Sequence, residues 1–208
     1  INYQSFEDKI YVADFFFTTC PTICPKMKQQ MLRVYDTFKN EKQVSILSHT
    51  SDPKPDTVEV LKDFSEKLGV SAPKWHFVTG KKDSIYHIGK NSYMVTAQES
   101  EDAPGGFIHS GAFILVDQKK RVRGIYDGTK PEEVDKLISD IKKLIQSSEK
   151  STWLLRTLHI LIISCLLFSG ACIETTQKEG MHIPGQLEGQ ELVKFKQYYV
   201  QGQMLYTQ

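Results

Sequence analysis

Two cysteines, Cys20 and Cys24, lie four residues apart directly after the apolar run 10–17, which reads IYVADFFF. Aromatic and β-branched residues in such a run are typical of a buried strand, and the prolines beside the cysteines favour a helix start. The unpaired N–H groups of a first helical turn stabilise thiolates. Because four residues are slightly more than one helical turn, we expect both sulfurs to face the same way and to share one ion or form one disulfide.

Composition limits the remaining possibilities. With 208 residues, of which 40% are hydrophobic, the chain is long enough for one good core and a small appendage. A net charge of +1 argues against nucleic acid as a partner, since no strongly basic face is available to neutralise phosphates. Four cysteines are too few for a disulfide scaffold, and Cys165 and Cys172 lie in a separate, late apolar stretch.

The hydrophobic pattern predicts one α/β layered domain over residues 1–146. Strands are expected at 10–17, 43–50 and 75–80, helices at 25–40, 57–69, 81–93 and 131–146, and a β-hairpin at 107–128 with a charged turn near 118–120. Asp56 is expected to cap the helix that ends at Gly69. Because residue 1 is Ile and a strand follows almost at once, we expect an N-terminally truncated domain.

Residues 147–172 are predicted to be a polar linker followed by a hydrophobic signal-like or anchor-like helix. The uncharged run 160–171 is short for a bilayer span, which needs about 20 residues, but has the length of a signal-peptide core. It ends in small residues before Cys172 and so resembles a bacterial lipoprotein signal, although Ser169 stands where that pattern usually has Leu, Val or Ile. A short membrane anchor and a buried helix are the alternatives.

The last segment, residues 173–208, is predicted to be a polar linker and a short helical tail. Residues 188–208 resemble the first helix of a class I cytochrome c, and a plain amphipathic helix is the alternative. The sequence has no CxxCH motif, so no haem can be attached covalently to it.

The early cysteine pair is compatible with three kinds of chemistry: a structural disulfide, a redox-active dithiol, or a soft-metal site. Two sulfurs leave most metals under-coordinated, and a histidine is the expected third ligand. Among six histidines, His109 is the best placed, because it follows the flexible pair Gly105-Gly106 and opens the predicted hairpin. A solvated or capping histidine remains the alternative at this point.

Three motifs carry a resemblance to the SCO/SenC family. They are DFFFTTCPTICPKM at 14–27, TSDPKPDT at 50–57 and GGFIHSGAFILVD at 105–117. They occur in the family's order and at plausible spacing, and the likeness covers roughly residues 6–146. The sequence departs from the family's DPxRD pattern at Pro55, which stands in place of the arginine.

The resemblance implies a thioredoxin-like fold with a central mixed sheet and a copper site. Carried over by position, the copper ligands are Cys20, Cys24 and His109, and Asp52 lies near the site. The implied function is that of a metallochaperone, rather than an enzyme, which binds copper(I) or copper(II) and helps to assemble the binuclear copper centre of cytochrome c oxidase. The implied partners are the oxidase subunit that holds this centre and a thiol–disulfide reductant. The implied location is extracytoplasmic, on the periplasmic side, with a membrane tether that is either the hydrophobic segment or a missing N-terminal anchor.

Two other functions remain open from the sequence. One is a thiol–disulfide oxidoreductase of the same fold with reductase activity, in which Cys20 and Cys24 are the redox-active pair. Against this, CxxxC differs from the CxxC of thioredoxins, and no cis-proline signature stands before a strand where a thioredoxin would have one. The third possibility is a fragment of an electron-transfer protein, defined by the cytochrome-like tail.

Overall fold

The computed structural model describes residues 3–95, 111–168 and 205–206, with side chains for 5–95 and 111–149. Its helices are η1 (Tyr3–Phe6), α1 (Cys24–Phe38), α2 (Val58–Leu68), α3 (Lys82–Asn91) and α4 (Pro131–Phe168), and its strands are β1 (Ile10–Phe16), β2 (Val44–Thr50), β3 (Trp75–Thr79), β4 (Ala112–Val116), β5 (Val122–Asp127) and β6 (Leu205–Tyr206). The strand order is β5-β4-β1-β2-β3-β6. The expected alternation of strands and helices is confirmed.

The sheet is mixed, as expected. β1, β2 and β3 pair in parallel, whereas β4 runs antiparallel to β1, β5 to β4, and β6 to β3. The parallel strands are connected by helices because a crossover between parallel strands needs more residues than a tight turn supplies. β1 lies between β2 and β4, and all seven of its residues are buried.

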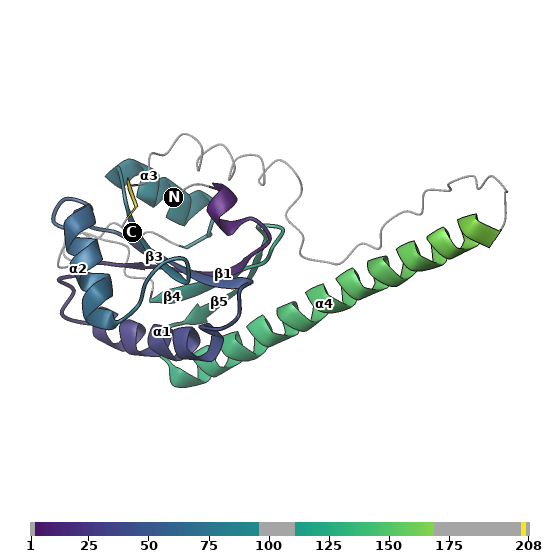
Figure 1. The fold of residues 1–208 in the computed structure, drawn as a ribbon. Helices are drawn as coiled ribbons and strands as arrows, with labels where there is room; N and C mark the ends of the chain where they lie inside the picture. The colour runs from purple at the N-terminus through teal and green to yellow at the C-terminus, as the bar shows by residue number, and fades with distance from the viewer. Residues whose placement is uncertain (1–2, 96–110, 169–204, 207–208) are drawn as a thin grey trace.

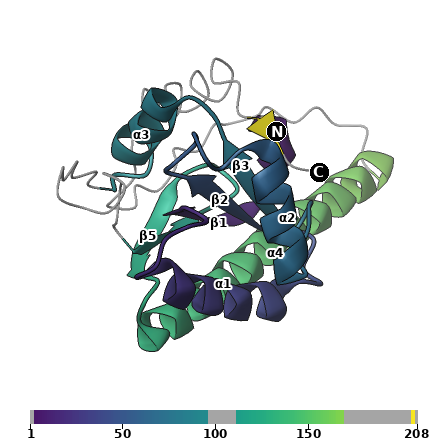
Figure 2. The same ribbon diagram turned by 90° about the vertical axis from the view of Figure 1, so that its left-hand side faces the viewer.

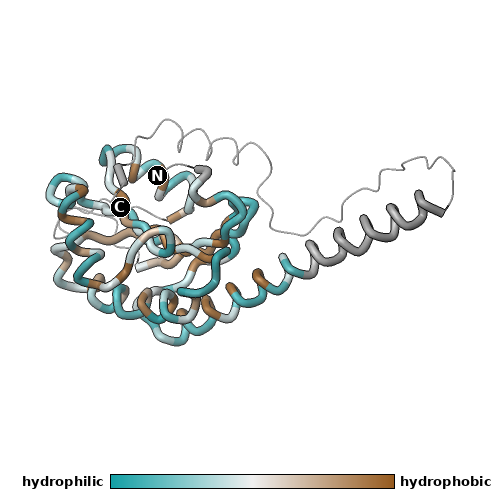
Figure 3. Tube along the Cα trace, in the orientation of Figure 1, coloured by the Kyte–Doolittle hydropathy of each residue, from teal (hydrophilic) through white to brown (hydrophobic). Residues whose placement is uncertain are grey.

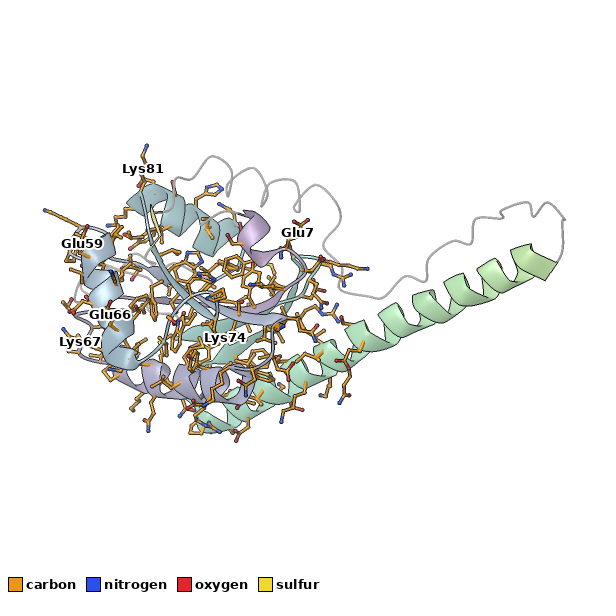
Figure 4. All side chains as sticks on the ribbon, in the orientation of Figure 1. Glu7, Glu59, Glu66, Lys67, Lys74 and Lys81 are labelled. Atoms are coloured by element: carbon orange, nitrogen blue, oxygen red, sulfur yellow. The ribbon has the colours of Figure 1, made fainter. Side chains whose placement is uncertain are left out.

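Helices cover both faces of the sheet (Figures 1 and 2). Each interface is apolar. On one face, α1, α2 and α4 contribute Met31, Leu61 and Leu137 to a core with alternate residues of the strands. On the other face, η1 and α3 contribute Phe6 and Ile88 to a second core. The hydropathy colouring shows apolar residues along the strands and polar residues on the outer turns (Figure 3). The labelled charged side chains of α2, such as Glu59 and Glu66, lie at the periphery (Figure 4).

The ends of α2 show one confirmed prediction and one error. The helix ends as predicted, since Gly69 adopts a left-handed conformation with φ of 68° that favours glycine. The N-cap, however, is Thr57, whose side chain accepts a hydrogen bond from the Val60 N–H. The predicted cap, Asp56, is wrong, because its carboxylate is fully buried and binds elsewhere.

The closing helix α4 is longer than predicted. It was expected over 131–146 with a polar linker after it, but it continues without interruption to Phe168 and includes residues 147–152. The part that follows the domain projects away from the sheet (Figure 1). Within the residues that the structure describes, no helix is both long and apolar enough to cross a bilayer.

Two further features concern single segments. Leu205–Tyr206 form a short strand against β3, where a helix was expected, while most of the predicted tail lies outside the described residues. A cis peptide bond joins Ala72 and Pro73 directly before β3. This bond lies at the opposite end of the parallel strands from the cysteine loop, because the cysteines follow the end of β1.

Candidate metal centre

The cysteine loop, residues 17–23, starts at the end of the central strand β1. Its first turn is closed by a hydrogen bond from the Cys20 N–H to the Phe17 carbonyl at 3.2 Å. Ser51, directly after the neighbouring strand β2, donates through its N–H to the Phe16 carbonyl at 2.8 Å. The loop is therefore anchored to the rigid centre of the sheet at the point where it leaves it.

A buried carboxylate fixes the same loop from the side. Asp56 is 0% exposed and accepts hydrogen bonds from the Thr18 N–H at 3.1 Å, from the Thr18 hydroxyl, and from the Thr50 hydroxyl at 2.5 Å. Because burial of a carboxylate is costly without partners, these bonds account for its position in the interior. They tie the loop that precedes Cys20 to the turn before α2.

Cys20 is a free cysteine in the loop just before α1, and its side chain is buried, with 7% exposed. It packs with Phe17 and Tyr86, and its Sγ lies 3.7 Å from the Thr22 hydroxyl. Burial acts to raise the pKa of its thiol, but hydrogen bonds from the Cys24 thiol and N–H and from Thr22 outweigh it and lower the pKa below the ordinary value. Cys20 is thus the thiol that ionises more easily.

Cys24 is the first residue of α1, is also free, and is half-buried. Burial, the hydrogen bond with Cys20 and the nearby charge of Asp14 raise the pKa of its thiol to about 12. The two sulfurs lie within hydrogen-bonding reach of one another, so the prediction that they face the same way is supported by this contact. The two thiols are therefore chemically unequal: as the pH rises, Cys20 ionises first and Cys24 stays protonated.

Asp52 lies in the turn after β2, at the same end of the sheet as the cysteine loop. Its N–H donates to the Thr50 hydroxyl at 3.0 Å, and its side chain is partly exposed. Burial and the neighbouring Asp56 carboxylate raise the pKa of Asp52, against the opposing effect of Lys82 and Lys54. The structure therefore places Asp52 at the end of the sheet where the cysteine loop begins, near the cationic side chains of Lys82 and Lys54.

His109, the predicted third ligand, lies outside the residues that the structure describes, so its position remains a prediction. Of the other histidines, His49 stacks on Phe15 with 5.1 Å between ring centroids, and His76 packs edge-on against Phe6 with 5.2 Å between ring centroids. Both phenylalanines belong to the second core. Among the described residues, no group of three or more His, Cys, Asp or Glu side chains forms a metal site. The described part of the centre consists of the two thiols.

Sequence reasoning missed two carboxylates near the pair. Asp56 was assigned to a helix cap, and Asp14, which is 5% exposed, was counted only as part of an apolar strand. The available signal for Asp14 was its charge within an otherwise aromatic and β-branched run, because a buried carboxylate needs a specific reason. The signal for Asp56 was its place beside Thr57, a second residue able to cap the same helix.

Comparison with known proteins agrees with this arrangement. The family model SCO1/SenC matches residues 1–146. The SCO1 protein homolog of Bacillus subtilis is 34% identical over 146 residues, which cover 68% of this chain and 74% of that protein.

Two solved structures share the fold and about a third of the sequence. A SCO1/SenC family lipoprotein from Bacillus anthracis str. Ames has a TM-score of 0.61 and 32% identity, covering 68% of this chain and 84% of that one. BsSco, described as a member of the Sco family of cytochrome c oxidase assembly proteins with a disulfide switch, has a TM-score of 0.56 and 32% identity, covering 67% and 82%. With a thioredoxin-like mixed sheet, the two free thiols at the start of α1 and the family match over residues 1–146, this chain belongs to the SCO1/SenC family.

Proposed function

We propose that this chain is a copper-binding protein that serves in the assembly of the copper centre of cytochrome c oxidase. The observation that carries the proposal is the contact between two free thiols, Cys20 and Cys24, at the N-terminus of α1. Thiolates select soft cations such as copper(I), and a low thiol pKa favours the metal-binding form. The assembly role is supported by membership of the family to which BsSco belongs.

The third ligand in this proposal is His109. Two thiolates and one imidazole form a low-coordinate site suited to copper(I), and the same set also accommodates copper(II). Asp52 is proposed to lie at the rim of the site. The positive charges of Lys82 and Lys54 act to lower the pKa of its carboxyl group. Copper is the cargo here, and it leaves by ligand exchange with the oxidase subunit that receives it.

Redox state controls loading in this scheme, because a Cys20–Cys24 disulfide has no thiolate to offer. A thiol–disulfide reductant is therefore the second proposed partner. We propose an extracytoplasmic, membrane-tethered location, which is supported by the name of the Bacillus anthracis relative as a lipoprotein. The reading of 160–172 as a lipoprotein-like signal remains a prediction, since residues 169–172 lie outside the described part and 153–168 belong to α4.

The unequal thiols favour a second candidate, thiol–disulfide exchange. A nucleophilic Cys20 beside a protonated Cys24 is the arrangement that an exchange reaction needs. One sulfur attacks the substrate disulfide as a thiolate, while the other stays protonated during this step. The disulfide switch described for BsSco supports this reading of the pair. The third possibility, an electron-transfer fragment, rests on residues 188–208, most of which lie outside the described residues.

A copper(I) titration of the reduced chain tests the proposed function. We expect one copper per chain, with protons released on loading because thiols must become thiolates. Cys20→Ser, Cys24→Ser and His109→Ala should each weaken binding strongly. The matched control is His87→Ala on α3, which removes an imidazole that contacts Asn91 and should bind as the unmodified chain does.

The same titration separates the candidates. Retained copper binding in Cys20→Ser would contradict the metal site. Retained reduction of a disulfide substrate by His109→Ala, combined with unchanged copper affinity, would favour exchange as the main function.

A further inference from the structure

Thr22 lies in the cysteine loop between the two thiols, and its hydroxyl group contacts one of them. The Thr22 Oγ1 atom lies 3.7 Å from the Cys20 Sγ atom. Threonines near the start of a helix commonly cap its first turn. Here the N-cap of α1 is Ile23, which makes no side-chain hydrogen bond to the helix. The hydroxyl group of Thr22 is thus placed to act on a sulfur atom.

The backbone of the loop fixes this contact. Cys20 is buried, and its N–H donates to the Phe17 carbonyl at 3.2 Å. Its side chain packs with Phe17 and Tyr86. Thr22 follows two residues later and, as a β-branched residue, has few rotamers. The distance between the hydroxyl and the sulfur is therefore set by a short stretch of backbone rather than by long, flexible side chains.

The two sulfurs of the pair have different hydrogen-bond donors. The Cys20 sulfur accepts hydrogen bonds from the N–H groups of Thr22 and Cys24, and it also contacts the Cys24 thiol and the Thr22 hydroxyl. The Cys24 sulfur accepts a backbone hydrogen bond from Phe17. Because a thiolate has no hydrogen to give, the Thr22 hydroxyl is the donor whenever Cys20 is ionised.

Metal binding makes the hydroxyl of Thr22 more important. Cysteine binds a metal as a thiolate, so Cys24 loses the hydrogen with which it bonds to Cys20. Among the residues that the structure describes, the Thr22 hydroxyl is then the remaining side-chain donor to the Cys20 sulfur. A single substitution can therefore remove this side-chain hydrogen bond completely.

A hydrogen bond to a metal-bound thiolate changes which oxidation state of copper is favoured. The bond draws electron density toward the donor and makes the sulfur a weaker ligand. Copper(II) needs this electron density more than copper(I) does, because it carries the higher charge. Hydrogen bonding around a cysteine sulfur accordingly tunes the reduction potential of copper sites. A donor at Thr22 should stabilise copper(I) relative to copper(II).

We propose that Thr22 is a positioning residue that sets the preference of the site for copper(I) over copper(II), by donating a hydrogen bond to the Cys20 sulfur. This inference rests on the proposed function, because it requires copper bound at Cys20. It deepens that function by assigning the choice of oxidation state to a residue that is not itself a ligand. The side chain of Thr22 is exposed, so its substitution leaves the core unchanged.

The reduction potential of the bound copper tests this proposal. The full-length chain first receives Cys165→Ser and Cys172→Ser, so that Cys20 and Cys24 are its remaining thiols. Thr22→Val then replaces the hydroxyl with a methyl group, and Thr22→Ser keeps a hydroxyl. We expect Thr22→Val to lower the affinity for copper(I) relative to copper(II) by about tenfold, which lowers the potential by about 59 mV. Thr22→Ser should keep the potential of the parent chain.

The absorption spectrum of the copper(II) form is a second readout. In Thr22→Val the sulfur-to-copper charge-transfer band should move to longer wavelength, because a sulfur without the hydrogen bond gives up electron density more easily. The matched control is Thr37→Val on α1, whose hydroxyl donates to the Arg33 carbonyl at 2.7 Å within the helix. It should change neither the band nor the potential. Urea unfolding of the metal-free chains should give one common midpoint, since both threonines are exposed.

The outcomes separate this inference from the proposed function. An unchanged or higher potential in Thr22→Val would overturn the role of Thr22, as would an equal shift in Thr22→Ser or in Thr37→Val. With one copper still bound per chain, the proposed function would stand in each of these cases. A parent chain that binds no copper would refute the proposed function, and the role of Thr22 with it.

Discussion

Asp14 and His49 are buried side chains whose charged forms are disfavoured by folding, with opposite consequences for pH dependence. Burial raises the pKa of Asp14 from 3.8 to about 7 and lowers the pKa of His49 from 6.5 to about 3. The raised pKa of Asp14 adds to the free energy of unfolding. This contribution is complete below pH 3.8 and is lost as the pH rises to about 7. The contribution of His49 to the free energy of unfolding is complete above pH 6.5 and is lost as the pH falls toward 3. Their effects on stability therefore oppose each other between these limits.

Asp14→Asn should separate these two effects. Asn has no proton to lose, so the variant escapes the loss of stability that Asp14 causes as the pH rises. We expect the free energy of unfolding of Asp14→Asn, relative to the unmodified chain, to increase by roughly 3–4 kcal/mol between pH 4 and pH 7. Urea unfolding at several pH values measures this difference. Parallel pH curves for the two proteins would show that Asp14 is ionised in the folded state.

At the scale of elements, Asp56 joins the cysteine loop to the turn before α2. Its carboxylate accepts hydrogen bonds from Thr18 and Thr50, and Thr18 lies two residues before Cys20. The ends of β1 and β2 are thereby held together, at the side of the sheet where the thiols lie. The position of Cys20 depends on this connection as well as on the start of α1.

Asp56→Ala should loosen this connection. Loss of the carboxylate leaves two hydroxyl groups and one N–H without their acceptor, and we expect a loss of about 3 kcal/mol in the free energy of unfolding. Copper binding should weaken in the same variant, because Cys20 is held less firmly. Urea unfolding and copper titration measure the two effects. Asp63→Ala, which removes an exposed carboxylate from α2, is the control and should cost about 0.5 kcal/mol or less.

The contrast between Asp56 and Thr57 shows where sequence reasoning ended. Elements followed from hydrophobic periodicity, which depends on local burial, and their ends were correct where a local signal such as Gly69 was present. Asp56 and Thr57 are both good capping residues, and local sequence does not decide between them. The decision comes from Thr18, 38 residues away, which reaches Asp56 only after the sheet has formed.

The end of α4 and the candidate site show the same limit. Residues 147–152 were expected to be a linker because they are polar, but they contain neither Gly nor Pro, so nothing in them breaks a helix. For the site, local spacing predicted that the sulfurs of Cys20 and Cys24 would face the same way, which their contact supports. The proximity of Asp14 to Cys24, in contrast, required the packing of three strands and two helices around one cavity.

At the scale of the whole molecule, α4 has two parts with different surroundings. Its first turns supply Val134, Leu137 and Ile141 to the first core, and Asp140 accepts a hydrogen bond from the Tyr126 hydroxyl at 2.9 Å. The later part of α4 continues away from the sheet (Figure 1). Among the residues whose side chains the structure describes, the first core therefore includes the start of α4, and both thiols and the cavity lined by Cys24 and Asp14 precede this helix.

A chain that ends after Glu149 should consequently keep the fold and the thiol chemistry. We expect its free energy of unfolding to lie within about 1 kcal/mol of that of the full chain, since large effects arise from changes in the core. A chain that ends after Lys130 should fail to fold, because it loses three buried aliphatic side chains, each worth about 1.5–3 kcal/mol. Urea unfolding and copper titration of both chains test this division. Loss of the cooperative transition in the longer of the two would mean that residues 150–208 stabilise the domain, and the thiol pair would then have to be studied in the full chain.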